Sequence, residues 1–196
     1  MHISIEGFDG VGKTTTSQIL AKKLGFELVE KPLKYLFDPE GGDNNYLRIR
    51  DYVNEVSPRN RSFSACFYGL GNIFLYEKFK GQNIVTDRHL LSNYAWSGSD
   101  ESAPFFDAVY KAIGAPDFTF IVYGDSETIR KRLISRDEQD SDIKKLAKTE
   151  EIYNKMKFFA EKYSFPYLLI DTIDKKPEDI TAIMIEELSK RGLING

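Results

Sequence analysis

Apolar residues fall alternately into short β-prone runs and longer helical patterns along the chain. Five short runs predict strands, at residues 2–6, 26–30, 83–86, 118–123 and 167–170. Helical periodicity predicts helices at residues 13–24, 46–56, 62–80, 90–96, 105–113, 126–136, 149–163 and 177–190. The run at 118–123 is typical of a strand buried on both faces. Strands that alternate with helices indicate an α/β fold, with about five parallel strands and helices on both faces.

Composition supports a single folded unit. The chain has 196 residues, with 41% hydrophobic and 29% charged residues, so we expect one domain spanning residues 1–196. A net charge of -3 argues against a general nucleic-acid surface or an anionic membrane partner. Neither a signal peptide nor a long apolar stretch is visible, which predicts a soluble cytoplasmic protein. The one cysteine, Cys66, is expected to be a small buried apolar residue.

A glycine-rich motif follows the first predicted strand and opens the first predicted helix. Residues 7–14 match G-x-x-x-x-G-K-[ST] in full. Such glycines let successive backbone N–H groups face one concavity, which binds phosphate oxygens at a helix N-terminus. Lys13 is expected to reach the β- and γ-phosphates of ATP, and the Thr14 hydroxyl to ligate Mg²⁺. The predicted ATP-binding residues here are Gly7, Asp9, Gly10, Val11, Gly12, Lys13, Thr14 and Thr15.

This motif alone does not separate kinases from GTPases or motors. A GTPase would normally add N-K-x-D on a later strand, but Asn154-Lys155 is followed by Met156-Lys157. The sequence therefore favours a GTPase less than a kinase.

A second candidate motif stands where the predicted strand at 83–86 ends. Parallel sheets bind their ligands at the carboxyl ends of strands. Asp87 is therefore a candidate to orient Mg²⁺, and Arg88 to hold an acceptor phosphate. The alternative is an ion pair that caps the next helix.

Both motifs resemble those of the thymidylate kinase family. Residues 84–95 are similar to its signature D-R-Y-x-x-S-x-x-A, and residues 5–13 resemble its loop E-G-x-[DE]-G-x-G-K. The resemblance implies a P-loop kinase fold, ATP and Mg²⁺, a nucleoside monophosphate acceptor and a homodimer. It also implies that Asp9 contacts the 3′-hydroxyl of the acceptor sugar, and that Lys13, Asp87 and Arg88 are catalytic.

The resemblance extends to the acceptor site and to a mobile lid. Residues 63–65 match the segment F-x-A, whose phenylalanine stacks on the nucleobase, so Phe63 is the stacking candidate. Further candidates for substrate binding are Arg50, Phe67 and Tyr94. Residues 126–136 look like the helix that leads into the family's lid, here roughly residues 136–148.

Two arginines of this helix match the family pattern. Arg132 is expected to bind ATP. Because Gly10 leaves no arginine inside the phosphate loop, Arg136 is the predicted catalytic cation at the transferring phosphoryl group. The alternative is a solvated basic helix face.

Departures from the family pattern leave more than one candidate for the substrate that accepts the phosphoryl group. Phe67 occupies the position of the arginine that reads thymine, and His89 replaces the motif tyrosine. The related deoxynucleoside kinases place a glutamate base after the second strand, where Glu30 stands one residue early and Lys31 follows. A monophosphate kinase is the leading hypothesis. A deoxynucleoside kinase and a nucleotide-binding protein without turnover are the alternatives.

Overall fold

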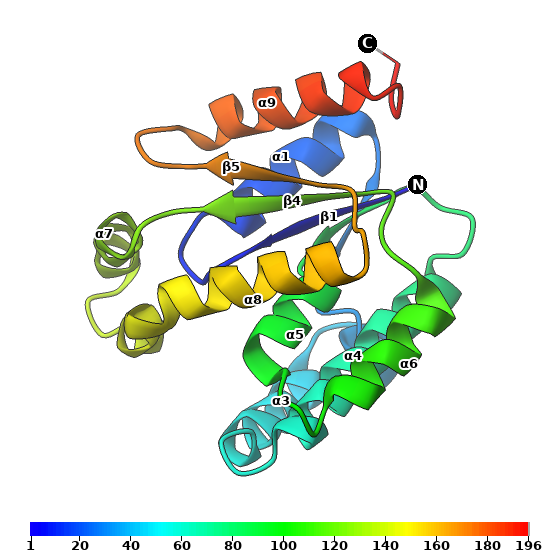
Figure 1. Ribbon diagram of the computed structural model, residues 1–196, viewed down its shortest axis with the longest axis vertical. Helices are drawn as coiled ribbons and strands as arrows, with labels where there is room; N and C mark the ends of the chain where they lie inside the picture. Colours follow the sequence, from blue (N-terminus) through cyan, green and yellow to red (C-terminus); the bar gives the residue numbers. More distant parts are fainter. Residues whose placement is uncertain (196) are drawn as a thin grey trace.

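The computed structural model describes residues 1–195 and contains a five-stranded sheet with the order β2-β3-β1-β4-β5 (Figure 1). Every neighbouring pair of strands is parallel. The strands are β1 (His2–Gly7), β2 (Glu27–Glu30), β3 (Ile84–Asp87), β4 (Phe118–Tyr123) and β5 (Tyr167–Asp171). The predicted parallel α/β sheet is therefore confirmed, and β4 is an interior strand between β1 and β5.

Helices cover both faces of this sheet, as predicted (Figure 1). The helices are α1 (Lys13–Leu24), α2 (Lys34–Phe37), α3 (Asn44–Val56), α4 (Arg61–Lys78), α5 (Leu90–Ser97), α6 (Ala103–Ile113), α7 (Ser126–Arg136), α8 (Thr149–Lys162) and α9 (Pro177–Lys190), with a 3₁₀ helix η1 (Ser141–Lys148). Helices α1 and α9 lie together on one face, and α5 and α8 lie on the other. Helices α4 and α6 pack against each other beyond α5.

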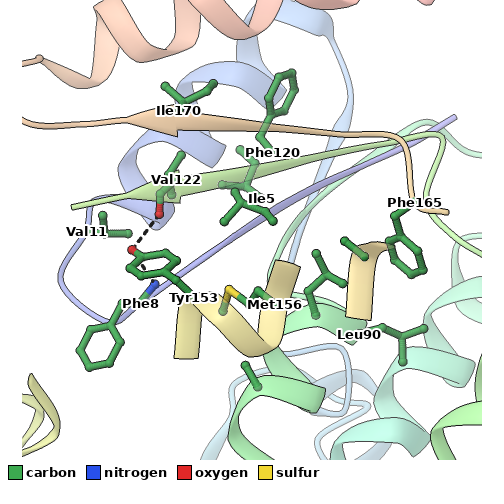
Figure 2. Close-up of a cluster of buried hydrophobic side chains, with 14 of the residues drawn as sticks. Ile5, Phe8, Val11, Leu90, Phe120, Val122, Tyr153, Met156, Phe165 and Ile170 are labelled. Atoms are coloured by element: carbon green, nitrogen blue, oxygen red, sulfur yellow. Dashed lines mark hydrogen bonds between the residues drawn. The ribbon is translucent and has the colours of Figure 1, made fainter. Parts of the chain in front are cut away.

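The core lies on both sides of the central strands. All six residues of β1 are buried, and five of the six residues of β4 are buried. Figure 2 shows that Ile5, Phe120 and Met156 contribute to one apolar cluster, which joins the sheet to α8. Burying a side chain of this size stabilises the fold by about 1.5–3 kcal/mol. The central strands therefore form a rigid support for the loops at their carboxyl ends.

Three features differ from expectation. The structure contains α2 between the segments predicted at 26–30 and 46–56, and η1 between those predicted at 126–136 and 149–163, and the apolar pattern predicted neither element. The expectation that Cys66 is buried is wrong, because this cysteine is exposed. Cys66 is three residues after Phe63 and four before Leu70 on α4, and both of these neighbours are also exposed. Helical periodicity thus places Cys66 on the outer face of α4.

The strand order puts a topological switch point between β1 and β3, and the crevice of such sheets is the region outside the carboxyl ends of these two strands. The helix that follows β1 lies on one face of the sheet, and the helix that follows β3 lies on the other (Figure 1). Ligands of open α/β sheets bind at such a switch point, outside the carboxyl ends of the strands. Within residues 1–195, no helix is both long and apolar enough to cross a bilayer.

Candidate active site

The loop between β1 and α1 depends on its glycines. Gly7, Gly10 and Gly12 have φ angles of 151°, 78° and 102°. A Cβ atom on Gly7 would lie 2.5 Å from the carbonyl oxygen of Val122, and one on Gly10 would lie 2.5 Å from the side chain of Leu133. The first turn of α1 contains no acidic residue, and no side chain among residues 1–195 caps its N-terminus. The loop is therefore compact and leaves a helix N-terminus available for an anion.

Lys13 lies inside this loop. Its side chain is buried, and its ammonium group donates a 2.6 Å hydrogen bond to the carbonyl oxygen of Phe8. Burial, followed by the charge of Arg88, lowers the pKa of Lys13 to about 8. Thr14 and Thr15, the next two residues, are exposed at the start of α1. The loop thus presents one cation and two hydroxyl groups near its backbone N–H groups.

Thr14 and Asp87 bring two oxygen ligands together across the crevice. The Thr14 hydroxyl donates to Oδ2 of Asp87 at 2.5 Å. Oδ1 of Asp87 is buried and has no hydrogen-bond partner within residues 1–195. A hydroxyl beside a carboxylate with an unused oxygen is a donor set that suits Mg²⁺. These residues therefore fit the metal that the sequence predicts.

Glu30 lies beside Asp87 at the same edge of the sheet. The two residues are register partners at the ends of β2 and β3. Oε1 of Glu30 is also buried without a partner in the described part of the chain. Lys31, the next residue, has a φ of 48° and forms a 3.0 Å ion pair with Asp43. Lys31 is thus directed to a surface carboxylate.

Arg88 forms the centre of the polar network behind the phosphate loop. Its backbone has a φ of 80°, which is uncommon for any residue other than glycine. Nη1 donates to the carbonyl oxygen of Gly7 at 3.0 Å and to the Ser92 hydroxyl at 3.1 Å, and Nη2 donates to Asp9. These bonds fix the plane of the guanidinium group beside the phosphate loop.

Asp9 is ionised at this site. Burial alone would raise its pKa, but the charges of Arg88, Lys13 and Lys145 outweigh that effect and lower it to about 2. Lys145 comes from η1, and its Nζ is 3.8 Å from Oδ2 of Asp9 and 2.6 Å from Oδ1 of Asp142. The same ammonium group is 5.5 Å from the ring centroid of Trp96. Sequence reasoning missed Lys145 and Trp96, because nothing local separates Lys145 from its neighbours Lys144 and Lys148.

The two arginines of α7 have different environments. Arg136 is 60% exposed and pairs with Asp140 and, at 3.7 Å, with Asp142. Arg132 donates to the carbonyl oxygen of Val11 at 3.0 Å, and to the hydroxyl and carbonyl oxygens of Thr172 at 2.9 and 2.7 Å. The guanidinium group of Arg132 therefore connects the phosphate loop to the segment after β5.

Aromatic side chains lie along α4, the helix that packs against α5 and α6. Phe63 is 42% exposed near the N-terminus of α4. The ring of Phe67 is nearly parallel to that of Phe37, at an angle of 7° with their centroids 6.2 Å apart. Burial raises the pKa of the Tyr68 phenol, whereas the charges of Arg50 and Arg88 both oppose this shift. Tyr68 therefore lies within electrostatic reach of two arginines, one from α3 and one from the loop after β3.

Arg50 and Tyr94, which were also predicted to bind the substrate, contact residues outside the network around Arg88. Arg50 donates two hydrogen bonds to its neighbour Asp51. Tyr94 packs against Phe106 and Phe159, with centroids 5.2 and 4.7 Å apart, and thus belongs to an aromatic cluster between α5, α6 and α8. Neither side chain contacts the network around Arg88 in the described residues.

Comparisons with known proteins agree with this fold. The family model for thymidylate kinase matches residues 5–182. A probable thymidylate kinase of Methanocaldococcus jannaschii is 29% identical over 92% of this chain and 91% of its own length. Deoxyadenosine kinase from M. mycoides has a TM-score of 0.67 at 18% identity, covering 97% of this chain and all of its own. Thymidylate kinase from Ehrlichia chaffeensis has a TM-score of 0.64 at 20% identity, covering 96% and 98%.

Proposed function

Because the chain belongs to the thymidylate kinase family, we propose that it transfers the γ-phosphoryl group of ATP to a nucleoside monophosphate and releases the diphosphate. One observation carries this proposal above the others. Lys13 and Arg88 lie on the two sides of the crevice between β1 and β3, and Asp9 connects them electrostatically. This arrangement supports a site in which Lys13 would bind the donor phosphates and Arg88 the acceptor phosphate.

Phosphoryl transfer depends mainly on positioning and on neutralising charge. Lys13 and the backbone N–H groups of the glycine loop would bind the triphosphate. Thr14 and Asp87 would hold Mg²⁺, which when bound would supply positive charge to neutralise the phosphates. Lys145, which reaches Asp9 from η1, would add positive charge on the lid side. Arg136 would join this site only after leaving its carboxylate partners, Asp140 and Asp142.

The acceptor would bind on the opposite side of the crevice. The ionised carboxylate of Asp9 can only accept hydrogen bonds, which suits a sugar hydroxyl as the donor. Arg88 would bind the acceptor phosphate, which is already anionic and needs no general base. The exposed ring of Phe63 is available to stack on a base. Phe67, packed on Phe37, offers a further apolar surface in place of a base-reading arginine, so we infer that stacking contributes strongly to recognition of a pyrimidine.

A deoxynucleoside kinase is the second candidate, and Glu30 favours it. Its Oε1 atom is buried and unpartnered within residues 1–195, beside Asp87 in the sheet. Such a carboxylate is placed to take a proton from a sugar hydroxyl. A third candidate is a nucleotide-binding protein without turnover. We also expect a homodimer by resemblance to the family, which light scattering would test.

One screen separates these candidates. The purified protein is incubated with ATP, Mg²⁺ and each common nucleoside or nucleoside monophosphate, and products are identified by mass spectrometry. Lys13→Ala serves as the blank. We expect diphosphates from one or more deoxypyrimidine monophosphates. Product from nucleosides alone would establish the second candidate. ATP binding without any product would establish the third.

A further inference from the structure

Glu6 is a fully buried carboxylate on β1 whose contacts extend to the active site. It has no exposed surface, and within residues 1–195 no lysine or arginine forms an ion pair with it. Oε2 accepts hydrogen bonds from the backbone N–H of Ser92, at 3.1 Å, and from the Ser92 hydroxyl. Oε1 accepts from the Ser4 hydroxyl at 3.2 Å. A buried carboxylate is costly unless it is hydrogen-bonded in this way.

The Ser92 hydroxyl connects Glu6 to Arg88. A hydroxyl has one hydrogen to donate and two lone pairs that accept. Because the hydrogen of Ser92 is directed to Glu6, its lone pairs are free to accept the 3.1 Å bond from Nη1 of Arg88. The direction of this chain is therefore fixed, and the negative charge of Glu6 strengthens it. Burial raises the pKa of Glu6, while the hydrogen bonds of Ser92 and the charge of Arg88 oppose that shift.

Arg88 needs such support because its backbone is held in an uncommon conformation. Its φ of 80° places it in a region that residues other than glycine rarely occupy, and such residues concentrate at functional sites. The backbone N–H of Arg88 donates to the carbonyl oxygen of Ile5 at 2.9 Å. Nη1 is held from two sides, by the Gly7 carbonyl and by the Ser92 hydroxyl.

We propose that Glu6 and Ser92 are positioning residues, which orient the guanidinium group of Arg88 toward the acceptor phosphate without contacting the substrate. The inference rests on the proposed function, in which Arg88 binds that phosphate. The competing explanation is that these hydrogen bonds only stabilise the core. Ser4 distinguishes these two explanations, because its hydroxyl donates to the same carboxylate but has no hydrogen bond to Arg88 in the described residues.

The kinetic test compares Ser92→Ala with the matched control Ser4→Ala. Each variant removes one buried hydroxyl that donates to Glu6. For Ser92→Ala we expect kcat/KM for the acceptor to fall about tenfold, while the KM for ATP stays within about twofold. For Ser4→Ala we expect both constants to stay within about twofold of the wild type. Equal losses in the two variants, or none in Ser92→Ala, would overturn the proposal.

Glu6→Gln provides a second route if Ser92→Ala folds poorly. A glutamine keeps the shape of the side chain, its amide oxygen accepts from Ser92, and its NH₂ group donates to the Ser4 hydroxyl. We expect it to keep the melting temperature near the wild-type value but to lower kcat/KM for the acceptor. An unchanged kcat/KM would count against a role for the charge.

A readout without turnover distinguishes failure of this inference from failure of the proposed function. The Nε–H signal of Arg88 in ¹⁵N NMR spectra, assigned with Arg88→Lys, reports whether the guanidinium group is ordered. We expect faster exchange with water in Ser92→Ala but not in Ser4→Ala. If the wild type phosphorylates no acceptor, the proposed function fails, and this signal still decides the inference: an unchanged signal in Ser92→Ala would refute it.

Discussion

Replacing Tyr153 with phenylalanine would test how α8 supports the phosphate loop. Tyr153 lies in α8, and its side chain is buried. Its hydroxyl donates to the carbonyl oxygen of Val122 at 2.9 Å and accepts from the backbone N–H of Phe8 at 3.3 Å (Figure 2). One hydroxyl thus joins α8, the end of β4 and the first residue after β1.

The magnitude follows from the two groups that lose their partner. A buried donor or acceptor left without a hydrogen bond costs about 1–3 kcal/mol. The bond to Val122 is short and should contribute most, whereas the bond to Phe8 is long and should contribute less. We therefore expect Tyr153→Phe to lower the free energy of unfolding by about 2–3 kcal/mol. For a domain of this length, that loss lowers the melting temperature by roughly 4–12 °C.

The assay is urea or thermal unfolding followed by circular dichroism, with Tyr123→Phe as the control. The ring of Tyr123 lies 4.9 Å from that of Tyr153, and its hydroxyl forms no hydrogen bond within residues 1–195. We expect the control to stay within about 0.5 kcal/mol of the wild type. If both variants lose the same stability, or if Tyr153→Phe loses none, the reasoning about this hydroxyl is wrong.

Three further predictions concern the phosphate loop and α4. Because burial lowers the pKa of Lys13 to about 8, the free protein loses this proton as the pH rises through 8, so ATP affinity should fall above pH 8. Above pH 8, calorimetry in two buffers should then detect uptake of up to about one proton when ATP binds. An ATP affinity that stays constant up to pH 10 would contradict this prediction. Gly7→Ala should lower the free energy of unfolding by about 2 kcal/mol or more, and Gly25→Ala by about 1 kcal/mol. Both positions have a positive φ, but only at Gly7 would the new Cβ lie 2.5 Å from the carbonyl oxygen of Val122. Urea unfolding compares the two variants, and equal losses would contradict this contact. Cys66, being exposed, should react with a thiol reagent at nearly the same rate in folded and denatured protein, and strong protection in the folded protein would contradict its placement.

Local sequence information was sufficient to predict the strands, most helices and the phosphate loop. The spacing of Gly7, Gly12 and Lys13 encodes one backbone shape, and the alternation of apolar runs encodes a parallel sheet. The same logic places Asp87 at a strand end, where its carboxylate meets Thr14. These features depend on residues that are close in sequence or on a periodic pattern.

Partners of polar groups could not be predicted, because they depend on distant parts of the chain. Ser92 reaches Glu6 across 86 residues, and Lys145 reaches Asp9 from η1. The pattern of charges on α7 did not reveal that Arg132 binds backbone and hydroxyl oxygens of the protein. The residue type of Cys66 alone favours burial, but its helical phase, shared with Phe63 and Leu70, puts it on the outer face of α4.

The most direct test of the account follows a labelled γ-phosphate from ATP. The protein is mixed with γ-labelled ATP, Mg²⁺ and a deoxypyrimidine monophosphate, and the label is traced by chromatography, with Lys13→Ala in parallel. The account predicts that the label appears in the nucleoside diphosphate with the wild type, and that Lys13→Ala transfers none. Label that remains in ATP, or that appears only as inorganic phosphate, for every monophosphate offered would contradict the account.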